Sequence, residues 1–285
     1  MTLTDERPQT DHRPPQMLWL DLTRKCQLEC THCFNASGPD GGHGTMTRDD
    51  WTRVLDEASN CGVERVQLIG GEPTMHPAAI EIACHALDLG MAVEVYSNLV
   101  HVPATWWDLF LRAGVSIATS YYGATAEEHN AVTERPTHRL TRGNIARAVG
   151  LGIPIRVGVI DTGDEQRAER ARRDLETIGV TRISIDRVRA FGRAADGQAP
   201  DTAELCGRCG TGRAAIGPTG GVSPCAMSSW ISVGNVHDAP LAAIVDSAAM
   251  AEATSTIGTM TGQGGCEPDD ECTPGTPGSE CNPKA

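Results

Sequence analysis

Residues 26–33, Cys26-Gln27-Leu28-Glu29-Cys30-Thr31-His32-Cys33, place three thiols within eight positions in the spacing C-x3-C-x2-C. Three thiolates can bind three irons of a cubane iron–sulfur cluster, which leaves the fourth iron without a protein ligand. A cluster used only for electron transfer is normally closed by a fourth cysteine. The motif therefore predicts a cluster with an open iron, which the amine and carboxylate of a small molecule could complete.

Two other uses of these cysteines are open at this point. A structural zinc site usually has two C-x2-C or C-x2-H pairs a dozen or more residues apart. Here Cys30 and Cys33 form one such pair, and Cys26 is a third thiol that zinc does not need. A disulfide knot fits a secreted chain, but residues 1–16 are polar and proline-rich and lack the apolar segment of a signal peptide. The spacing favours a cluster over both.

Composition limits the class of protein. The chain has 285 residues, 40% of them hydrophobic, which is enough for one large domain or two smaller ones. No apolar run approaches the roughly 18 residues that a membrane span needs. The formal net charge of −13 argues against a nucleic-acid partner, because phosphate binding requires basic surfaces. Eleven cysteines without an export signal indicate a cytoplasmic protein that uses them for metal or cluster binding.

Between residues 17 and 190, short apolar runs alternate with amphipathic segments. The pattern predicts an α/β fold of six β–α units, which is too few for a closed eight-unit barrel and fits a partial (β/α)6 TIM-like barrel. Its lateral opening would admit a large substrate. Thr47 is the expected N-cap of the first helix, with Asp50 bonding back to it. The predicted strands are 17–22, 63–69, 92–96, 115–119, 153–160 and 182–188, and the helices are 47–61, 78–89, 104–113, 142–150 and 165–178.

Polar residues follow several of these strands. Gly70-Gly71-Glu72-Pro73 comes after the second strand, and its glycines would let the backbone approach a ligand that a Cβ would exclude. An ordinary tight turn is the alternative. Since parallel strands end at one edge of a sheet, these residues are expected beside the cysteine loop. Further strand-end residues that we expect to face the cavity, as substrate contacts or proton-transfer groups, are Tyr121, Tyr122, Asp161 and Asp186. Polar residues that only satisfy turns are the alternative.

Together, C-x3-C-x2-C and the G-G-E-P turn about forty residues later resemble the radical S-adenosylmethionine (SAM) superfamily. The resemblance implies a 4Fe-4S cluster on Cys26, Cys30 and Cys33, with SAM bound to the unique iron. Reductive cleavage of SAM would release a 5′-deoxyadenosyl radical that takes hydrogen from a substrate. An external electron donor of the flavodoxin or ferredoxin type is implied as a partner.

The resemblance also implies SAM contacts. Gly70, Gly71 and Glu72 stand where the family's GGE motif meets the methionyl amine. Ser97 and Asn98 stand where similar members have T-N-G, and Ser120 stands at the start of their S-L-D-G, whose Asp is missing here. Arg135 could pair with the carboxylate of SAM, because a guanidinium binds a carboxylate bidentately; a solvated surface arginine is the alternative.

From residue 191 the chain becomes richer in Gly, Pro and Cys, which indicates a domain boundary. We predict a tail over 1–16, a radical SAM partial barrel over 17–190, and a linker with a Cys-rich auxiliary domain over 191–285. Cys206-x2-Cys209 and Cys225 resemble the SPASM or shorter twitch extension, which holds one or two auxiliary 4Fe-4S clusters. The tail adds thiols that depart from the full SPASM spacing, and a zinc ribbon is the alternative; these are Cys266, Cys272 and Cys281.

Members of this subgroup that carry the extension mostly modify ribosomally made peptides (RiPP maturases). The resemblance thus implies a peptide cross-link, epimerisation or oxidation. A sugar or cofactor precursor is the small-molecule alternative, and an iron–sulfur electron carrier or a zinc protein is the non-enzyme alternative. Sixteen residues before the first strand leave no room for a leader-binding module, so a separate leader-peptide-binding protein is an expected partner.

Overall fold

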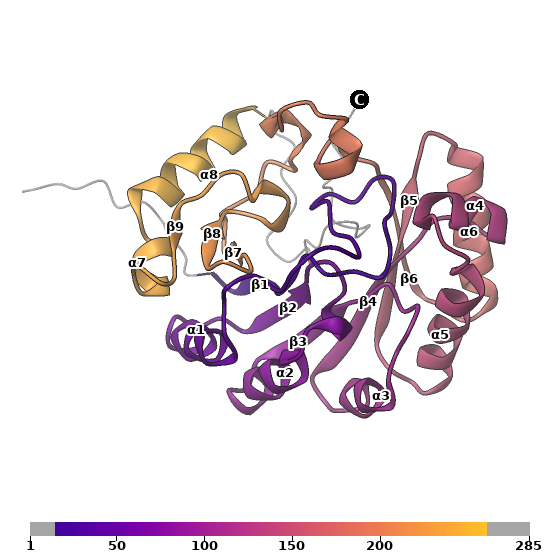
Figure 1. Cartoon of the computed structure of the whole chain (residues 1–285), viewed down its shortest axis with the longest axis horizontal. Coiled ribbons are helices and arrows are strands. Elements are labelled where there is room, and N and C mark those ends of the chain that lie inside the picture. Colours follow the sequence, from indigo (N-terminus) through magenta and orange to yellow (C-terminus); the bar gives the residue numbers. More distant parts are fainter. Residues whose placement is uncertain (1–14, 261–285) are drawn as a thin grey trace, which may run out of the picture.

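The computed structural model describes residues 15–260, and the first six strands of this part are parallel and lie in sequence order across the sheet (Figure 1). Each strand pairs with the next, so that their carboxyl ends share one edge of a curved, open sheet. This agrees with the predicted partial barrel. The strands are β1 (Met17–Asp21), β2 (Arg65–Ile69), β3 (Ala92–Tyr96), β4 (Val115–Tyr121), β5 (Ile155–Asp161) and β6 (Arg182–Arg187).

Helices cover the outer face of this sheet (Figure 1). The first begins as predicted, with a capping box in which Thr47 and Asp50 each bond the other's backbone amide. One helix was missed: α4 (Ala126–Thr133) follows β4 where only a loop was expected, although its own capping box, Thr125 with Glu128, was legible in the sequence. The remaining helices of this part are α1 (Arg48–Asn60), α2 (Ala79–Asp88), α3 (Ala104–Phe110), α5 (His138–Gly150) and α6 (Glu165–Thr177).

The C-terminal part continues the same sheet. β7 (Arg213–Ile216) pairs with β1 in parallel, and two short antiparallel strands, β8 (Gly221–Ser223) and β9 (Gly234–Asn235), follow at the edge. Single-turn helices η2 (Gly192–Ala195), η3 (Thr202–Glu204) and η4 (Ala226–Ser228) lie in the connections. Two helices, α7 (Leu241–Val245) and α8 (Ala248–Met260), end the described chain. Cys266, Cys272, Cys281 and most of the predicted 1–16 tail lie outside the described residues.

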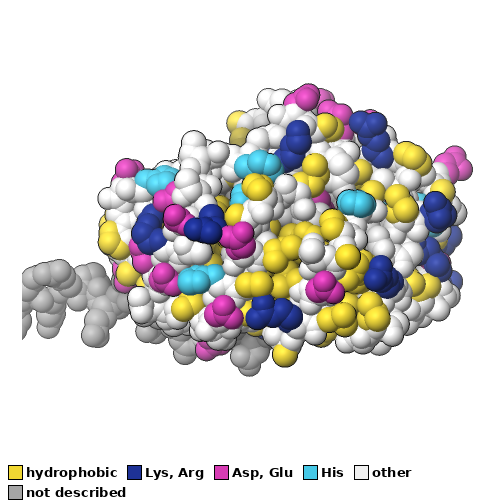
Figure 2. Space-filling model, turned by 60° about the horizontal axis from the view of Figure 1, so that its bottom comes forward, with side chains coloured by type: hydrophobic (Ala, Val, Ile, Leu, Met, Phe, Trp, Pro, Cys, Tyr) yellow, Lys and Arg dark blue, Asp and Glu magenta, His cyan; other side chains and the backbone are white. Residues whose placement is uncertain are grey.

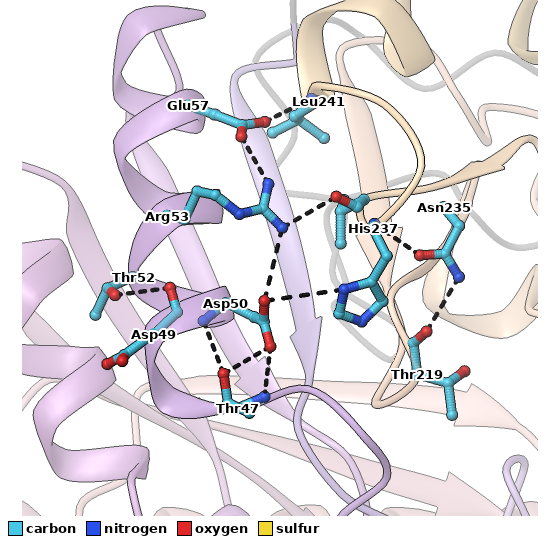
Figure 3. A network of polar contacts seen from close by, with 11 residues as sticks. Thr47, Asp49, Asp50, Thr52, Arg53, Glu57, Thr219, Asn235, His237 and Leu241 are labelled. Atoms are coloured by element: carbon cyan, nitrogen blue, oxygen red, sulfur yellow. Dashed lines mark hydrogen bonds and ion pairs between the residues drawn. The ribbon is translucent and has the colours of Figure 1, made fainter.

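A polar network joins α1 to this C-terminal part (Figure 3). The Arg53 guanidinium donates to the Val236 carbonyl at 3.0 Å and to Glu57 at 2.7 Å. The other oxygen of Glu57 accepts from the Leu241 amide, the first residue of α7. The bond from Leu241 satisfies a backbone amide in the first turn of α7. Together, these bonds hold the C-terminal elements against α1.

Apolar packing occurs on both faces of the sheet, as expected for parallel strands. The main core fills the space between strands and outer helices. A second core cluster lies on the opposite face and joins inward-facing strand residues to the C-terminal part; it consists of Met17, Trp19, Ile69, Phe191, Leu205, Cys209, Ala215, Cys225, Ala226 and Ile257. The Cys-rich region therefore packs directly on β1.

Within residues 15–260, no helix has both the length and the apolar composition needed to cross a membrane. The face in Figure 2 mixes acidic and basic side chains around a central group of hydrophobic ones. That face therefore presents no continuous basic surface of the kind that nucleic-acid binding would require.

Candidate functional site

The three thiols of the cysteine loop line one pocket at the carboxyl ends of the strands. The loop begins directly after β1, so its position is set by a fully buried strand. Other lining residues come from the ends of β2 to β6 and from the C-terminal connections. They include Gly70, Gly71, Ser97, Asn98, Ser120, Tyr122, Asp186, Arg189, Arg193 and Met227.

The thiols are also oriented by local hydrogen bonds. The Cys26 sulfur accepts from the Leu28 amide at 3.4 Å and from the Asn98 side chain at 3.7 Å. The Cys33 thiol donates to Asn35 at 3.0 Å. No disulfide bond joins any of the eight cysteines within residues 15–260, which speaks against the disulfide knot in that part of the chain.

Gly70 and Gly71 allow the turn after β2 to press against the start of the cysteine loop. Gly70 has φ +138°, and a Cβ on it would lie 2.5 Å from the Thr23 carbonyl oxygen. A Cβ on Gly71 would lie 2.2 Å from the carbonyl oxygen of Lys25. The amides of Gly71 and Glu72 donate to these two carbonyls. The backbone at these glycines therefore makes a close approach. It approaches the backbone at the start of the cysteine loop, whereas the sequence predicted an approach to a ligand.

Glu72 lies beneath the pocket and does not line it. Its side chain is fully buried, and its two carboxylate oxygens accept from the amides of Thr74 at 3.0 Å and Asn98 at 2.8 Å. Burial raises the pKa of this carboxyl against the effect of those bonds. Here the carboxylate ties the turn after β2 to the end of β3, and the expected contact of Glu72 with an ammonium group stays a prediction.

Burial determines the protonation of two of these thiols. Burial raises the pKa of Cys26 and of Cys30 to about 12, so both thiols would stay protonated without a metal. Ligation to iron supplies the positive charge that stabilises a thiolate. Three sulfurs lining one pocket thus fit the donor set of an iron–sulfur cluster with one open position.

Several predicted residues share the pocket with these thiols. Ser97 and Asn98 lie at the end of β3, and the Ser120 hydroxyl of β4 bonds the Tyr96 hydroxyl at 2.9 Å. Tyr122 packs edge-on against His32 with ring centroids 5.1 Å apart. Asp186, at the end of β6, pairs with Arg189 at 3.2 Å. These groups line the same pocket as the thiols, and Asn98 and Tyr122 contact the cysteine loop itself.

Three predicted residues do not line this pocket. Tyr121 is fully buried on the other face of β4, where its hydroxyl bonds His138 and Asp174. Asp161 accepts from the amides of Gly163 and Asp164 and stabilises the turn before α6. Arg135 is exposed and does not line the pocket. Side chains alternate along a strand, so Ser120 and Ile160 face the pocket and their neighbours Tyr121 and Asp161 do not.

Sequence reasoning missed a buried polar group on the pocket floor. The Arg156 guanidinium donates two hydrogen bonds to the Glu94 carboxylate, at 2.8 and 2.7 Å. The same carboxylate accepts a bond from the side-chain amide nitrogen of Gln67. Gln67 lines the pocket, and its buried Oε1 has no hydrogen-bond partner within the described part of the chain. Polar residues inside the apolar runs of β2, β3 and β5 were a usable signal, because charges are rarely buried without a partner.

The C-terminal cysteines form a second group. Cys209 and Cys225 are buried in the second core cluster, and Cys206 packs against it. Hydrogen bonding to Cys206 and Cys225, together with burial, raises the pKa of Cys209. The structure thus brings together the three described cysteines that were predicted to bind an auxiliary cluster. Within residues 15–260, no three or more His, Cys, Asp or Glu side chains form a group that could hold a single metal ion.

Family models match both parts of the chain. The model described as "Radical SAM superfamily" matches residues 20–178, and the SPASM model, "Iron-sulfur cluster-binding domain", matches residues 206–273. The first covers β1 to α6, with the cysteine loop and the turn after β2. The second begins at Cys206.

Curated proteins with similar sequences match over shorter stretches. The chain is 24% identical over 183 residues to a PqqA peptide cyclase of Granulibacter bethesdensis, covering 63% of this chain and 49% of that protein. It is 36% identical over 86 residues to the PqqA peptide cyclase of Rhodopseudomonas palustris, covering 30% and 22%. An AdoMet-dependent heme synthase of Methanosarcina barkeri is 32% identical over 117 residues, covering 41% and 34%. The matches thus span half or less of these relatives.

Solved structures share the fold. Streptococcus suis SuiB bound to precursor peptide SuiA superposes with a TM-score of 0.71 at 15% identity, covering 85% of this chain and 67% of that one. The protein anSMEcpe with bound AdoMet and Cp18Cys peptide gives 0.65 at 13%, covering 86% and 84%. At such low identity these likenesses establish the architecture, an open parallel α/β barrel followed by a C-terminal extension.

Proposed function

Because the chain belongs to the radical SAM superfamily, we propose that it binds a 4Fe-4S cluster through Cys26, Cys30 and Cys33 and cleaves SAM in the pocket above them. The observation that carries this proposal is the shared lining. Three thiols, the turn after β2 and the polar ends of β3 and β4 border one space. An electron carrier or a zinc protein has no use for such a pocket beside an open iron.

When bound, the cluster would pass one electron from an external flavodoxin- or ferredoxin-type donor to SAM, giving methionine and a 5′-deoxyadenosyl radical. The chain's own residues hold the reactants. Gly70 and Gly71 line the pocket, where their backbone would meet the methionyl end of SAM, and the Glu72 carboxylate keeps that backbone in position. Asn98 and Ser120 offer hydrogen-bonding groups for the remaining polar atoms.

We propose a peptide as the substrate. Support comes from the open edge of the sheet at β6 and from relatives named as peptide cyclases. Hydrogen transfer to the 5′-deoxyadenosyl radical would leave a substrate radical. An epimerised product would regain a hydrogen atom, whereas a cross-linked or oxidised product would lose a further electron. Cys206, Cys209 and Cys225 would hold an auxiliary cluster, which would supply an acceptor for that electron.

A small-molecule substrate is the second candidate, supported by the match to a protein named AdoMet-dependent heme synthase. Co-expression with short peptides encoded beside the gene separates the two. A mass change in such a peptide that needs Cys30 supports the peptide proposal. Peptides of unchanged mass, together with SAM cleavage that proceeds at full rate in their absence, would contradict it.

Anaerobic reconstitution tests the cleavage itself. The reduced protein should convert SAM to 5′-deoxyadenosine and methionine in equal amounts. A reconstituted, reduced protein that leaves SAM intact would overturn the proposed function. Cys61→Ser is the control variant, because Cys61 is a half-buried cysteine outside both groups. This variant should leave the yield of 5′-deoxyadenosine unchanged.

A further inference from the structure

Arg193 bonds the cysteine loop at three points. Its backbone amide donates to the Cys33 carbonyl at 3.0 Å. Its guanidinium donates through Nε to the Cys30 carbonyl at 2.7 Å and through a terminal nitrogen to the Ser37 carbonyl at 2.8 Å. These bonds link η2, which leads into the Cys-rich part, to a loop more than 150 residues earlier in the chain.

The preceding residue makes this contact possible. Gly192 has φ +56°, and a Cβ on it would lie 2.3 Å from the Cys33 carbonyl oxygen and 2.5 Å from the Phe34 carbonyl. Only glycine fits so close to the loop, and its left-handed backbone turns Arg193 toward the thiols. The contact is thus built into the backbone of the connection.

Arg193 also differs from the other arginines of the pocket in its charge balance. Arg187 pairs with Glu204 at 2.7 Å, and Arg189 pairs with Asp186. The guanidinium of Arg193 donates to carbonyl oxygens, and within residues 15–260 it forms no ion pair with a carboxylate. A fixed guanidinium with no acidic partner, lining the same pocket as three thiols, points to an anionic occupant. A cubane held by three thiolates is anionic, and reduction adds a further negative charge.

We propose that Arg193 is a positioning residue that clamps the cysteine loop and, through its fixed positive charge, raises the reduction potential of the cluster bound there. The inference rests on the proposed function, since it needs a cluster on Cys26, Cys30 and Cys33. Hydrogen bonds and nearby charge are known to set the potential of such clusters.

Two substitutions separate the clamp from the charge. Arg193→Gln removes the charge, and Arg193→Lys keeps it while losing the planar fork that holds two carbonyls at once. Arg187→Gln is the matched control. It also removes a positive charge from this pocket, but that charge is paired with the carboxylate of Glu204. The readouts are an EPR-monitored redox titration of the reconstituted full chain and hydrogen exchange of residues 26–37. The signal that changes on adding SAM identifies the radical cluster.

Arg193→Gln should shift the potential of that cluster to more negative values, while Arg193→Lys and Arg187→Gln stay near wild type. Both Arg193 variants should show faster exchange in the loop. A loaded Arg193→Gln protein with an unchanged potential, or a control shift of equal size, would overturn the charge role. If Arg193→Gln does not load, its iron-free form must still exchange faster than iron-free wild type, and equal exchange would overturn the clamp. A wild-type protein without a SAM-responsive cluster would instead defeat the proposed function.

Discussion

The two groups of cysteines are held in different ways. The thiols at 26, 30 and 33 lie on a loop anchored through its backbone, and they line a pocket. Cys209, in contrast, contacts the thiols of Cys206 and Cys225 within apolar packing around Trp19 and Ile257. The first arrangement leaves room for a ligand at the metal. The second suits a closed centre that exchanges only electrons.

Removing the second group should have the largest effect on iron content. Cys209→Ser should lower the iron bound by the reconstituted chain by about four atoms, the content of one cubane. SAM cleavage without substrate should persist, because the pocket thiols remain. Cys61→Ser is the control and should keep its iron. If Cys209→Ser binds as much iron as wild type, an auxiliary cluster at Cys209 is contradicted.

Gly71→Ala should disturb only the first group. The added Cβ would meet the Lys25 carbonyl oxygen at 2.2 Å, and relieving such a clash typically costs about 1–3 kcal/mol. We expect a matching loss in the free energy of unfolding, measured with urea, and poor loading of the SAM-responsive cluster.

Gly143→Ala provides the matched control for that change. Gly143 is exposed within α5 with nothing within 4 Å of a Cβ, so alanine there should stabilise by about 0.5–1 kcal/mol. Equal stability of Gly71→Ala and wild type would contradict the close approach of the turn to the cysteine loop.

Glu72→Gln should weaken the support of the pocket. Glutamine keeps one acceptor oxygen and turns a donor toward the second backbone amide, which leaves a buried amide unpaired at about 1–3 kcal/mol. The free energy of unfolding should fall by this amount, whether or not SAM is present. A variant as stable as wild type that binds SAM at least tenfold more weakly would return Glu72 to a direct contact with SAM.

The pH dependence of stability tests the surroundings of a buried histidine that packs against the pocket residue Tyr122. Burial lowers the pKa of His129, which packs against Tyr121 and Tyr122, to about 3. The pKa of a histidine in the unfolded chain is near 6.5. Between pH 6.5 and 3 the unfolded chain therefore binds one more proton at this residue than the folded chain, and the free energy of unfolding decreases as the pH is lowered. The slope is at most about 1.4 kcal/mol per pH unit for this residue. His129→Phe should reduce the slope between pH 6.5 and 5, and an unchanged slope would show that His129 is not buried in neutral form.

The sequence predicted the sheet because fully buried parallel strands leave continuous apolar runs, such as Met17–Asp21. It also predicted the cysteine loop, because ligand spacing is local. It could not assign Glu72 or Arg193, since the partners that decide their roles lie 26 and 163 residues away. Tyr121 was misjudged because the predicted strand ended two residues early, which hid the alternation that turns this side chain from the pocket.

The central claim is that the loop at 26–33, and not the second cysteine group, holds the cluster that SAM completes. Replacing Cys26, Cys30 and Cys33 together with alanine tests it most directly, through iron counts and Mössbauer spectra recorded with and without SAM. We expect about four irons to remain, the content of one cubane, with spectra that do not respond to SAM and no 5′-deoxyadenosine formed. A SAM-responsive iron site, or continued release of 5′-deoxyadenosine, in this variant would contradict the claim.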